Sequence, residues 1–164
     1  MADEATLIII KPDAIQRGLV GVAWSRLETL RLEVVGAKAV QVSKELAEIH
    51  YSHLREKPFF GELVDYLQGK LHGTSYVLAF VLWGERAIAR VRDVVGATHP
   101  EQADPSSIRG AFGRMTTAGV MENLVHASSD SREAQREIPL WFKPHELLRP
   151  VTGETSARPS RGSR

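Results

Sequence analysis

Residues 75–83 of the chain read SYVLAFVLW, which is its most apolar stretch of strand length. Tyrosine, valine and phenylalanine favour extended backbone. A strand with no alternation of apolar and polar residues is typical of a sheet covered on both faces. We therefore expect residues 75–83 to form a central strand, around which the other elements are arranged.

Three further stretches have the length and composition of strands, and five have the apolar spacing of helices. We expect strands at residues 5–11, 34–42 and 124–126, and helices at residues 18–31, 44–57, 59–67, 85–95 and 130–137. Two βαβ-like halves in this order predict an α+β fold, a ferredoxin-like sandwich with a four-stranded, largely antiparallel sheet and helices on one face. A doubly wound α/β sheet would give a similar order and remains the alternative.

The chain has 164 residues, of which 43% are hydrophobic and 25% charged, as expected of one globular domain. No apolar run reaches the roughly 18 residues that could span a membrane, and the first residues, MADEATL, lack the layout of a signal peptide. The absence of cysteine excludes disulfides, zinc–thiolate sites and a thiol nucleophile. We expect a cytoplasmic protein with no membrane partner.

A basic tail with few apolar residues follows the part of the chain that has strand and helix signals. Residues 149–164 carry four arginines against one glutamate, which leaves residues 1–148 slightly acidic. We expect residues 1–148 to form the folded domain and residues 149–164 to be disordered. Because the body has no basic excess, no specific nucleic-acid partner is predicted.

Residues 123–131 read NLVHASSDS and predict where the chemistry lies. Leu124 and Val125 indicate a buried strand that ends in His126, and small hydroxylic residues then form a tight turn. Asp130 suits an N-cap and Glu133 follows three residues later, so a helix is expected to begin here. Helix N-termini attract anions, and a histidine held beside an anion site indicates phosphate chemistry.

Two cations also stand at places where a ligand could reach them. Lys11 ends the first expected strand, where Pro12 is expected to start a turn, and Arg109 lies in residues 96–121, a stretch rich in turn-forming residues. The first strand–helix connection has neither a GxGxxG nor a GxxxxGK[ST] motif. A nucleotide site would therefore have to be built from scattered cations and the histidine.

Two further histidines, His50 and His53, lie on the helix expected at residues 44–57. Histidines three residues apart can chelate a metal ion. No acidic residue completes a familiar ligand pattern here, so we expect both side chains on the surface.

Six motifs occur in order along the chain: KPDAIQRG at residues 11–18, HY with KPFF at 50–51 and 57–60, GATHP at 96–100, IRG at 108–110, NLVHASS at 123–129 and LWF at 140–142. Together they closely resemble the nucleoside diphosphate kinases, over residues 6–147. The resemblance implies a ferredoxin-like fold and a ping-pong reaction. In that reaction a histidine takes the γ-phosphoryl of a nucleoside triphosphate, usually ATP with Mg²⁺, and passes it to a nucleoside diphosphate. It also implies a homo-oligomer, commonly a hexamer or a tetramer built from dimers.

The resemblance assigns roles to individual residues of this chain. His126 matches the phosphorylated histidine, and Ser128 and Glu137 match the residues that support it. Tyr51 matches the active-site tyrosine, and Phe59 matches the aromatic residue that stacks on the base. The residues that hold phosphates and ribose are matched by Lys11, Arg92, Thr98, Arg109 and Asn123. No direct protein ligand to the metal is implied, because Mg²⁺ is held mainly through the nucleotide phosphates.

These residue types suit phosphoryl transfer. The transferred group is strongly anionic, so cations from separate elements can hold and neutralise it. A neutral imidazole has a free nitrogen near pH 7, and Glu137 could hold the other nitrogen of His126. Stacking on Phe59, with nothing to read the base edge, predicts broad use of nucleotides.

Several positions depart from the family pattern. Ala127 and Ser129 stand in a turn that commonly reads HGSD, Ala111 replaces an aspartate common after IRG, and residues 70–74 and 113–121 are longer than in most relatives. Alanine is less free than glycine to take a positive φ, so this turn is expected to differ.

Three other functions are alternatives for a sequence of this kind. A non-catalytic, ferredoxin-like nucleotide-sensing or interaction module would be expected to lack the histidine or several of the phosphate-holding cations, and none is missing. An RNA-binding sheet needs exposed aromatic residues interleaved with basic ones, and the strand at residues 75–83 lacks the basic residues. A histidine-based phosphatase would pass the phosphoryl group to water.

Overall fold

The apolar stretch at residues 75–83 lies in a central strand, as expected. In the computed structural model, which describes residues 3–151, β3 (Val77–Glu85) pairs with β1 (Asp3–Ile10) on one side and with β2 (Glu33–Val40) on the other. Val81 and Leu82 are both buried but belong to different hydrophobic clusters, so the strand is covered on both faces.

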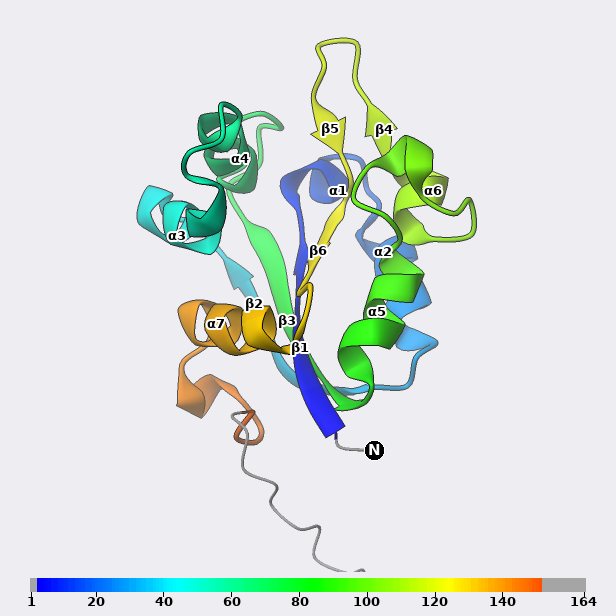
Figure 1. The fold of residues 1–164 in the computed structure, drawn as a ribbon, viewed down its shortest axis with the longest axis vertical. Coiled ribbons are helices and arrows are strands. Elements are labelled where there is room, and N and C mark those ends of the chain that lie inside the picture. Colours follow the sequence, from blue (N-terminus) through cyan, green and yellow to red (C-terminus); the bar gives the residue numbers. More distant parts are fainter. Residues whose placement is uncertain (1–2, 152–164) are drawn as a thin grey trace, which may run out of the picture.

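The remaining elements follow the expected alternation, with short additions. They are α1 (Pro12–Gln16), α2 (Val20–Glu28), α3 (Lys44–His50), η1 (Ser52–Leu54), α4 (Phe60–Leu67), α5 (Ala87–Val95), η2 (Pro100–Gln102), α6 (Ile108–Phe112), β4 (Arg114–Met115), β5 (Met121–Glu122), β6 (Val125–Ala127), α7 (Ser131–Trp141) and η3 (Pro144–Glu146). Here η marks a 3₁₀ helix. Figure 1 shows the β4–β5 hairpin projecting from one end of the main sheet.

The main sheet has the strand order β2-β3-β1-β6, and every neighbouring pair is antiparallel. Consequently β1 and β2 run in the same direction with β3 between them, and β3 and β6 run together with β1 between them. These two split βαβ units are those of a ferredoxin-like fold. The α+β prediction is confirmed, and a doubly wound parallel sheet is excluded.

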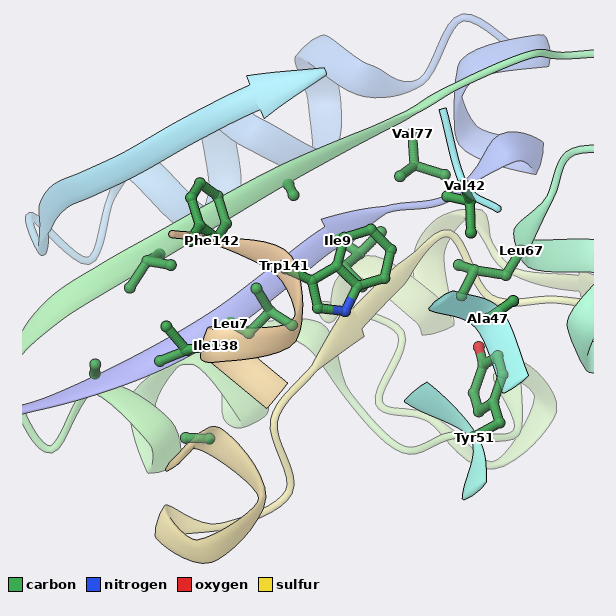
Figure 2. Packing of buried hydrophobic residues seen from close by; sticks show 14 of the residues in the cluster. Leu7, Ile9, Val42, Ala47, Tyr51, Leu67, Val77, Ile138, Trp141 and Phe142 are labelled. Atoms are coloured by element: carbon green, nitrogen blue, oxygen red, sulfur yellow. The ribbon is translucent and has the colours of Figure 1, made fainter. Parts of the chain in front are cut away.

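Helices cover both faces of the sheet, so the expectation of helices on one face is wrong. On one face α3, α4 and α7 pack around Ile9, and Trp141 of α7 lies beside it (Figure 2). On the other face α1, α2, α5 and α6 pack on Ile8 and Ile10. Figure 1 shows α3, α4 and α7 on one side of the strands and α2, α5 and α6 on the other. Because residues 7–10 of β1 are all apolar and fully buried, both of its faces need a cover.

The helix expected at residues 44–57 is shorter than predicted. Ser43 caps it as expected, since its hydroxyl accepts a hydrogen bond of 3.1 Å from Leu46 N. The helix α3 nevertheless ends at His50, and a separate 3₁₀ turn follows. The apolar spacing carries on through the break, which is why the periodicity did not reveal it.

Other boundaries also differ from the prediction. Pro12 begins α1 instead of a turn, since proline suits the first helical position. Residues 96–121, which were expected to be poor in secondary structure, contain α6 with Ser107 as its N-cap and the β4–β5 hairpin. The last helix runs past residue 137 and through Pro139 to its end at Trp141.

The last described residues pack against the sheet. Arg149 forms a salt bridge of 2.7 Å with Glu33 on β2, and Val151 contacts the cluster beneath α7. Residues 1–2 and 152–164 lie outside the described residues, so a domain at residues 1–148 with a disordered tail at 149–164 stays a prediction. None of the described helices has the length and apolar character needed to cross a membrane.

Candidate active site

His126 lies on the edge strand β6, opposite Ile9 of β1. Side chains alternate along a strand, so Val125 and Ala127 pack into one core while His126 points to the face that carries α3 and α7. The His126 side chain is 18% exposed, so part of the ring can be reached from solvent.

A buried carboxylate holds one nitrogen of His126. Nε2 lies 2.9 Å from Glu137 Oε2, and the same oxygen accepts a hydrogen bond of 2.8 Å from Ser128 Oγ. Ser128 is fixed to β1 in turn, because its N–H donates to the Leu7 carbonyl and its hydroxyl accepts from the Leu7 N–H. A carboxylate can only accept, so Nε2 carries the proton of the neutral ring and Nδ1 keeps its lone pair.

The surroundings keep this histidine neutral. Burial, and then the nearby charges of Lys11 and Arg109, hold the pKa of His126 well below its ordinary value. Burial also raises the pKa of Glu137. Both shifts act against an ion pair between the two side chains. A neutral imidazole with one nitrogen held and one free is suited to nucleophilic attack.

His50 packs against the ring of His126, so the surface position predicted for it is wrong. The two rings meet edge to face with centroids 4.5 Å apart, and His50 is 1% exposed. Its Nδ1 accepts a hydrogen bond of 3.1 Å from Trp141 Nε1. His50 lies one turn after Ala47 on the buried face of α3, whereas His53 is exposed as expected. Burial, and then the adjacent His126, lower the pKa of His50.

Within residues 3–151, His50, His126 and Glu137 are the one group of three side chains close enough to share a metal ion. Their ligand atoms lie within 4.8 Å of one another. The group does not suit Mg²⁺, which prefers oxygen ligands and keeps several waters. Within the group His126 is hydrogen-bonded to Glu137, and His50 is hydrogen-bonded to its neighbour Trp141. Hydrogen bonds of this kind orient a nucleophile.

Lys11 stands at the end of β1 with its ammonium group buried. Its Nζ donates a hydrogen bond of 2.7 Å to Asn123 Oδ1 and lies 5.2 Å from the centre of the Tyr66 ring. Burial, and then the charge of Arg109, lower the pKa of Lys11 to about 8, while Asp13 acts in the opposite direction. A cation with so little solvent around it gains strongly from an anionic ligand.

Arg109 fixes the backbone around the same place. Its guanidinium donates to the carbonyls of Gly96, Asn123 and Val125 at 3.1, 3.3 and 2.6 Å. Burial, and then the neighbouring charge of Arg92, lower its pKa to about 10. Arg109 therefore braces the strand of His126 as well as contributing positive charge.

Arg92 and Thr98 are exposed, and Arg92 is near enough to Arg109 to lower its pKa. Thr98 is tied to the buried part, because its carbonyl accepts a hydrogen bond of 2.9 Å from Asn123 Nδ2. Asn123 thus links Lys11 to the loop that carries Thr98. The arrangement brings positive charge from three elements to one side of a neutral, partly exposed histidine.

The comparison with known families decides what this arrangement belongs to. A family model described as nucleoside diphosphate kinase matches residues 4–147. The chain belongs to the nucleoside diphosphate kinase family. It is therefore an enzyme, a phosphotransferase, and a catalytic protein is favoured over a non-catalytic module of the same fold.

Individual nucleoside diphosphate kinases are similar over most of the chain. The protein of Pyrococcus horikoshii is 46% identical over 145 residues, which cover 88% of this chain and 88% of that protein. The protein of Thermus thermophilus is 46% identical over 145 residues, covering 88% of this chain and 99% of that protein. The similarity therefore covers the fold and the site together.

Solved structures of the family superpose on this one. A nucleoside diphosphate kinase of Borrelia burgdorferi, a transition-state mimic with bound vanadate and ADP, gives a TM-score of 0.80 at 35% identity and covers 90% of this chain and 92% of that one. The Halobacterium salinarum nucleoside diphosphate kinase in complex with CDP gives a TM-score of 0.80 at 39% identity, with 90% and 93% covered.

Two aromatic residues assigned from the family pattern lie in different environments. Phe59 precedes α4 and is 47% exposed, so its ring is available to a planar ligand. Tyr51 follows α3 and is buried near Ala47 and Leu67 (Figure 2). Burial raises the pKa of Tyr51 and keeps its hydroxyl protonated.

The turn after the nucleophile accommodates the departures from the family pattern. Ala127 is the last residue of β6 and packs in the core without a positive φ, so it needs no glycine-like freedom. Ser129 and Ala111 are exposed. Asp130 caps α7 as expected, since its carboxylate accepts a hydrogen bond of 2.8 Å from Glu133 N.

Sequence reasoning missed Asp13, which holds the backbone beside the nucleophile. Asp13 is fully buried, and its Oδ2 accepts a hydrogen bond of 3.0 Å from Leu124 N. Leu124 has a φ of 63°, a strained conformation for a branched side chain, and Asp13 stabilises it. The motif KPD carried the signal, but it was interpreted as a turn.

A surface hollow lies elsewhere. It has a volume of about 580 Å³ and is lined by residues of α2, of β2 and of the segment between them, among them Trp24, Val34 and Leu32. None of the predicted site residues borders it, so it is separate from the site at His126.

Proposed function

We propose that this nucleoside diphosphate kinase carries the phosphoryl group on Nδ1 of His126. The supporting observation is that Nε2 is held by Glu137, which leaves the lone pair on Nδ1, while the charges of Lys11 and Arg109 are near enough to lower the pKa of the ring. A nucleophile needs a fixed orientation and an available lone pair, and this arrangement provides both.

The reaction has two half-steps at the same nitrogen. The Nδ1 lone pair of His126 attacks the γ-phosphorus of a nucleoside triphosphate, an N–P bond forms, and the bond from phosphorus to the β-phosphate oxygen breaks. The nucleoside diphosphate leaves with that electron pair. A terminal phosphate oxygen of a second diphosphate then attacks the same phosphorus, breaks the N–P bond and restores the free imidazole. The Nε2 proton stays in place throughout, and the Glu137 carboxylate stabilises the positive ring formed with the phosphoryl group.

The cations have separate roles in this proposal. Lys11, as a compact charge, neutralises the negative charge on oxygen atoms of the transferred group. The exposed Arg92 holds the phosphates that stay on the nucleotide. Arg109 uses three of its donors on backbone carbonyls, so its main contribution is the positive potential and the fixed position of Asn123 and Val125. Thr98 and Asn123 offer polar groups to phosphate and ribose.

We propose that the nucleotide binds as its Mg²⁺ complex. The described residues fit a metal held by the nucleotide, because they present cations to phosphate oxygens and their one three-ligand group is committed to orienting His126. Bound Mg²⁺ would neutralise charge on the β- and γ-phosphate oxygens. The residues of the chain bind the phosphates, orient the imidazole and hold the proton on Nε2.

The proposal also includes the range of nucleotides used, the oligomeric state and the cellular location. The exposed ring of Phe59 can stack on any base, so purine and pyrimidine nucleotides, ribo- and deoxy-, are all expected as substrates. The complexes of two relatives with ADP and with CDP support nucleotides as the ligands. A homo-oligomer, a hexamer or a tetramer of dimers, and a cytoplasmic location remain part of the proposal.

A chase experiment tests the proposed transfer. The protein is incubated with Mg²⁺ and ATP labelled in the γ-phosphoryl, separated from nucleotide, and then given GDP. An acid-labile, alkali-stable label should form on the protein and move to GTP. The label should be absent in His126→Ala and unchanged in His53→Ala, which removes an exposed histidine. Release of the label only to water would identify a phosphatase and contradict the proposal.

A further inference from the structure

Residues 70–74, one of the segments longer than in most relatives, contact Glu122, which directly follows the other such segment at residues 113–121. The turn at residues 69–74 joins α4 to β3, and the β4–β5 hairpin ends at Glu122. Figure 1 shows α4 and the hairpin at the same end of the sheet. His72 of the turn and Glu122 of the hairpin form a hydrogen bond of 3.0 Å between Nε2 and Oε1, and each side chain is 4% exposed.

A tight turn places His72. Gly69 has a φ of 82°, and a Cβ there would overlap the carbonyl oxygen of Thr74. The N–H groups of His72 and Thr74 both donate to the Gly69 carbonyl, at 3.1 and 3.3 Å. Only glycine suits such a position, so the turn holds its histidine in one orientation.

The contacts of the His72 ring indicate which nitrogen carries the hydrogen in its neutral form. Its Nδ1 is buried and has no hydrogen-bond partner among residues 3–151. A buried N–H without an acceptor is costly, so the proton of a neutral ring sits on Nε2 and is donated to Glu122. The edge of the ring packs on Tyr66 of α4, with centroids 4.9 Å apart and the planes at 74°.

Glu122 is held from two further directions. Its Oε2 accepts a hydrogen bond of 2.7 Å from Arg114 Nε and lies 3.6 Å from Arg17 Nη1. Burial opposes its ionisation, but the hydrogen bonds from Arg114 and His72 keep the pKa of Glu122 below its ordinary value. The carboxylate is therefore an anchor that fixes the end of β5.

His72 and Glu122 are each connected to Lys11 through one neighbouring residue. Tyr66, which His72 supports, presents its ring to Lys11 Nζ at 5.2 Å. Asn123, which follows Glu122 in the chain, accepts the hydrogen bond of 2.7 Å from the same Nζ. The two supports of the buried ammonium group are thus tied to each other through the His72–Glu122 contact.

We propose that His72 and Glu122 are positioning residues that hold Lys11 for the nucleotide phosphate. A lysine side chain has many rotamers, and fixing it before the ligand arrives removes that entropic cost from binding. The inference rests on the phosphate-holding role proposed above for Lys11. Neither residue touches the nucleotide in this account, so both act only through Tyr66 and Asn123.

The pKa of Lys11 is a second quantity that the proposed contact should affect. The charged groups that act on it are Arg109 on α6, which disfavours its protonated form, and Asp13 on α1, which favours it. Burial is the largest influence and lowers its pKa. If loss of the His72–Glu122 contact loosens the supports, water reaches the ammonium group and its pKa rises toward the ordinary value.

The test uses variants of the full chain in this one contact. His72→Leu and Glu122→Met remove the hydrogen bond, because neither leucine nor methionine offers the missing donor or oxygen acceptor. His72→Gln can restore a donor, and Lys70→Ala is the matched control. Lys70 lies in the same turn and forms only an exposed pair of 2.9 Å with Asp65. KM for ATP and for a diphosphate, kcat, the pH dependence of kcat/KM and the unfolding temperature are measured for each.

We expect KM to rise about tenfold in His72→Leu and Glu122→Met, with kcat lowered less than KM is raised. The alkaline fall of kcat/KM should move to higher pH. The double variant should be no worse than Glu122→Met alone, because that single change already breaks the contact with His72. His72→Gln should recover most of the loss, and Lys70→Ala should match the parent protein.

Unchanged KM and pH dependence in Glu122→Met, which keeps the length of the side chain without its oxygen acceptor, would overturn the inference even if His72→Leu folds poorly. A lower unfolding temperature alone would likewise assign the pair a purely structural role and overturn it. Lys11→Met separates this inference from the proposed function. If Lys11→Met stays active, the phosphate role of Lys11 fails; if it is inactive while Glu122→Met is normal, only the positioning role fails.

Discussion

The carboxylate of Glu137 accepts hydrogen bonds from both His126 Nε2, at 2.9 Å, and Ser128 Oγ, at 2.8 Å, through the same oxygen atom. This shared acceptor fixes the ring plane and the tautomer of the proposed nucleophile. It also ties α7 to β6 at the point where chemistry is expected. Several measurable consequences come from this contact and its neighbours.

Replacing Glu137 with glutamine should slow phosphorylation more than it weakens nucleotide binding. Glutamine keeps the size of the side chain but cannot stabilise a positive phosphorylated ring. We expect the single-turnover rate of phosphorylation by ATP to fall about 10- to 100-fold, as measured by rapid quench. Glu48→Gln is the control, because Glu48 is a solvent-facing carboxylate that pairs with Lys44 at 3.7 Å. Equal rates for the Glu137 variant and the parent would contradict the role assigned to it.

The pH dependence of kcat/KM should show a fall above about pH 8, set by Lys11. Below its pKa Lys11 is protonated and attracts phosphate; as the pH rises through the pKa it becomes neutral and loses that attraction. The profile of kcat/KM reports the free enzyme, in which this pKa applies. Tyr51 cannot cause the fall, since burial raises its pKa. In Lys11→Arg the fall should disappear from this range, because arginine stays charged; a fall at the same pH in that variant would assign it to another group.

Removing the ring of Phe59 should weaken nucleotide binding without weakening the fold. Phe59 is 47% exposed, whereas Phe60 packs against the core. For Phe59→Ala we expect KM to rise about 3- to 10-fold for every base tested, with an unchanged unfolding temperature. Phe60→Ala should instead lower the unfolding temperature. A KM increase confined to one base would show that the base edge is read, against the predicted broad specificity.

Restoring glycine at position 127 should give no gain in activity. Ala127 lies in β6 without a positive φ and contributes its methyl group to the core. Glycine in a strand is less stable than alanine by about 0.5–1 kcal/mol, so Ala127→Gly should unfold at lower urea concentration with an unaltered rate. A clear rise in kcat would mean that the turn is strained by alanine.

The fold was predictable from local patterns, with errors where tertiary packing decides. The apolar run at residues 75–83 correctly indicated the central strand, and Ser43 and Asp130 correctly marked helix starts. The periodicity could not show that α3 ends at His50, because the apolar spacing continues through the following turn. Burial of both faces of β1 requires helices on both sides, which the order of elements alone does not specify.

The site was predictable as a set of residue types and less so as a set of contacts. The motif around His126 indicated phosphate chemistry because a histidine, a turn and a helix start are local features. His50 was misplaced because one residue on a helix can face the core or the solvent, and only the packing of α3 beside His126 decides. The contact between His72 and Glu122 joins residues 50 positions apart, and no local pattern encodes it.

The most direct test of the account is to locate the phosphoryl group on the isolated phosphorylated protein. Phosphorus NMR of the native protein, combined with mass spectrometry of its peptides under alkaline conditions, gives both the residue and the ring nitrogen. The account predicts one phosphoryl group on Nδ1 of His126, lost on addition of a nucleoside diphosphate. A phosphoryl group on Nε2, on another residue, or on none would contradict it.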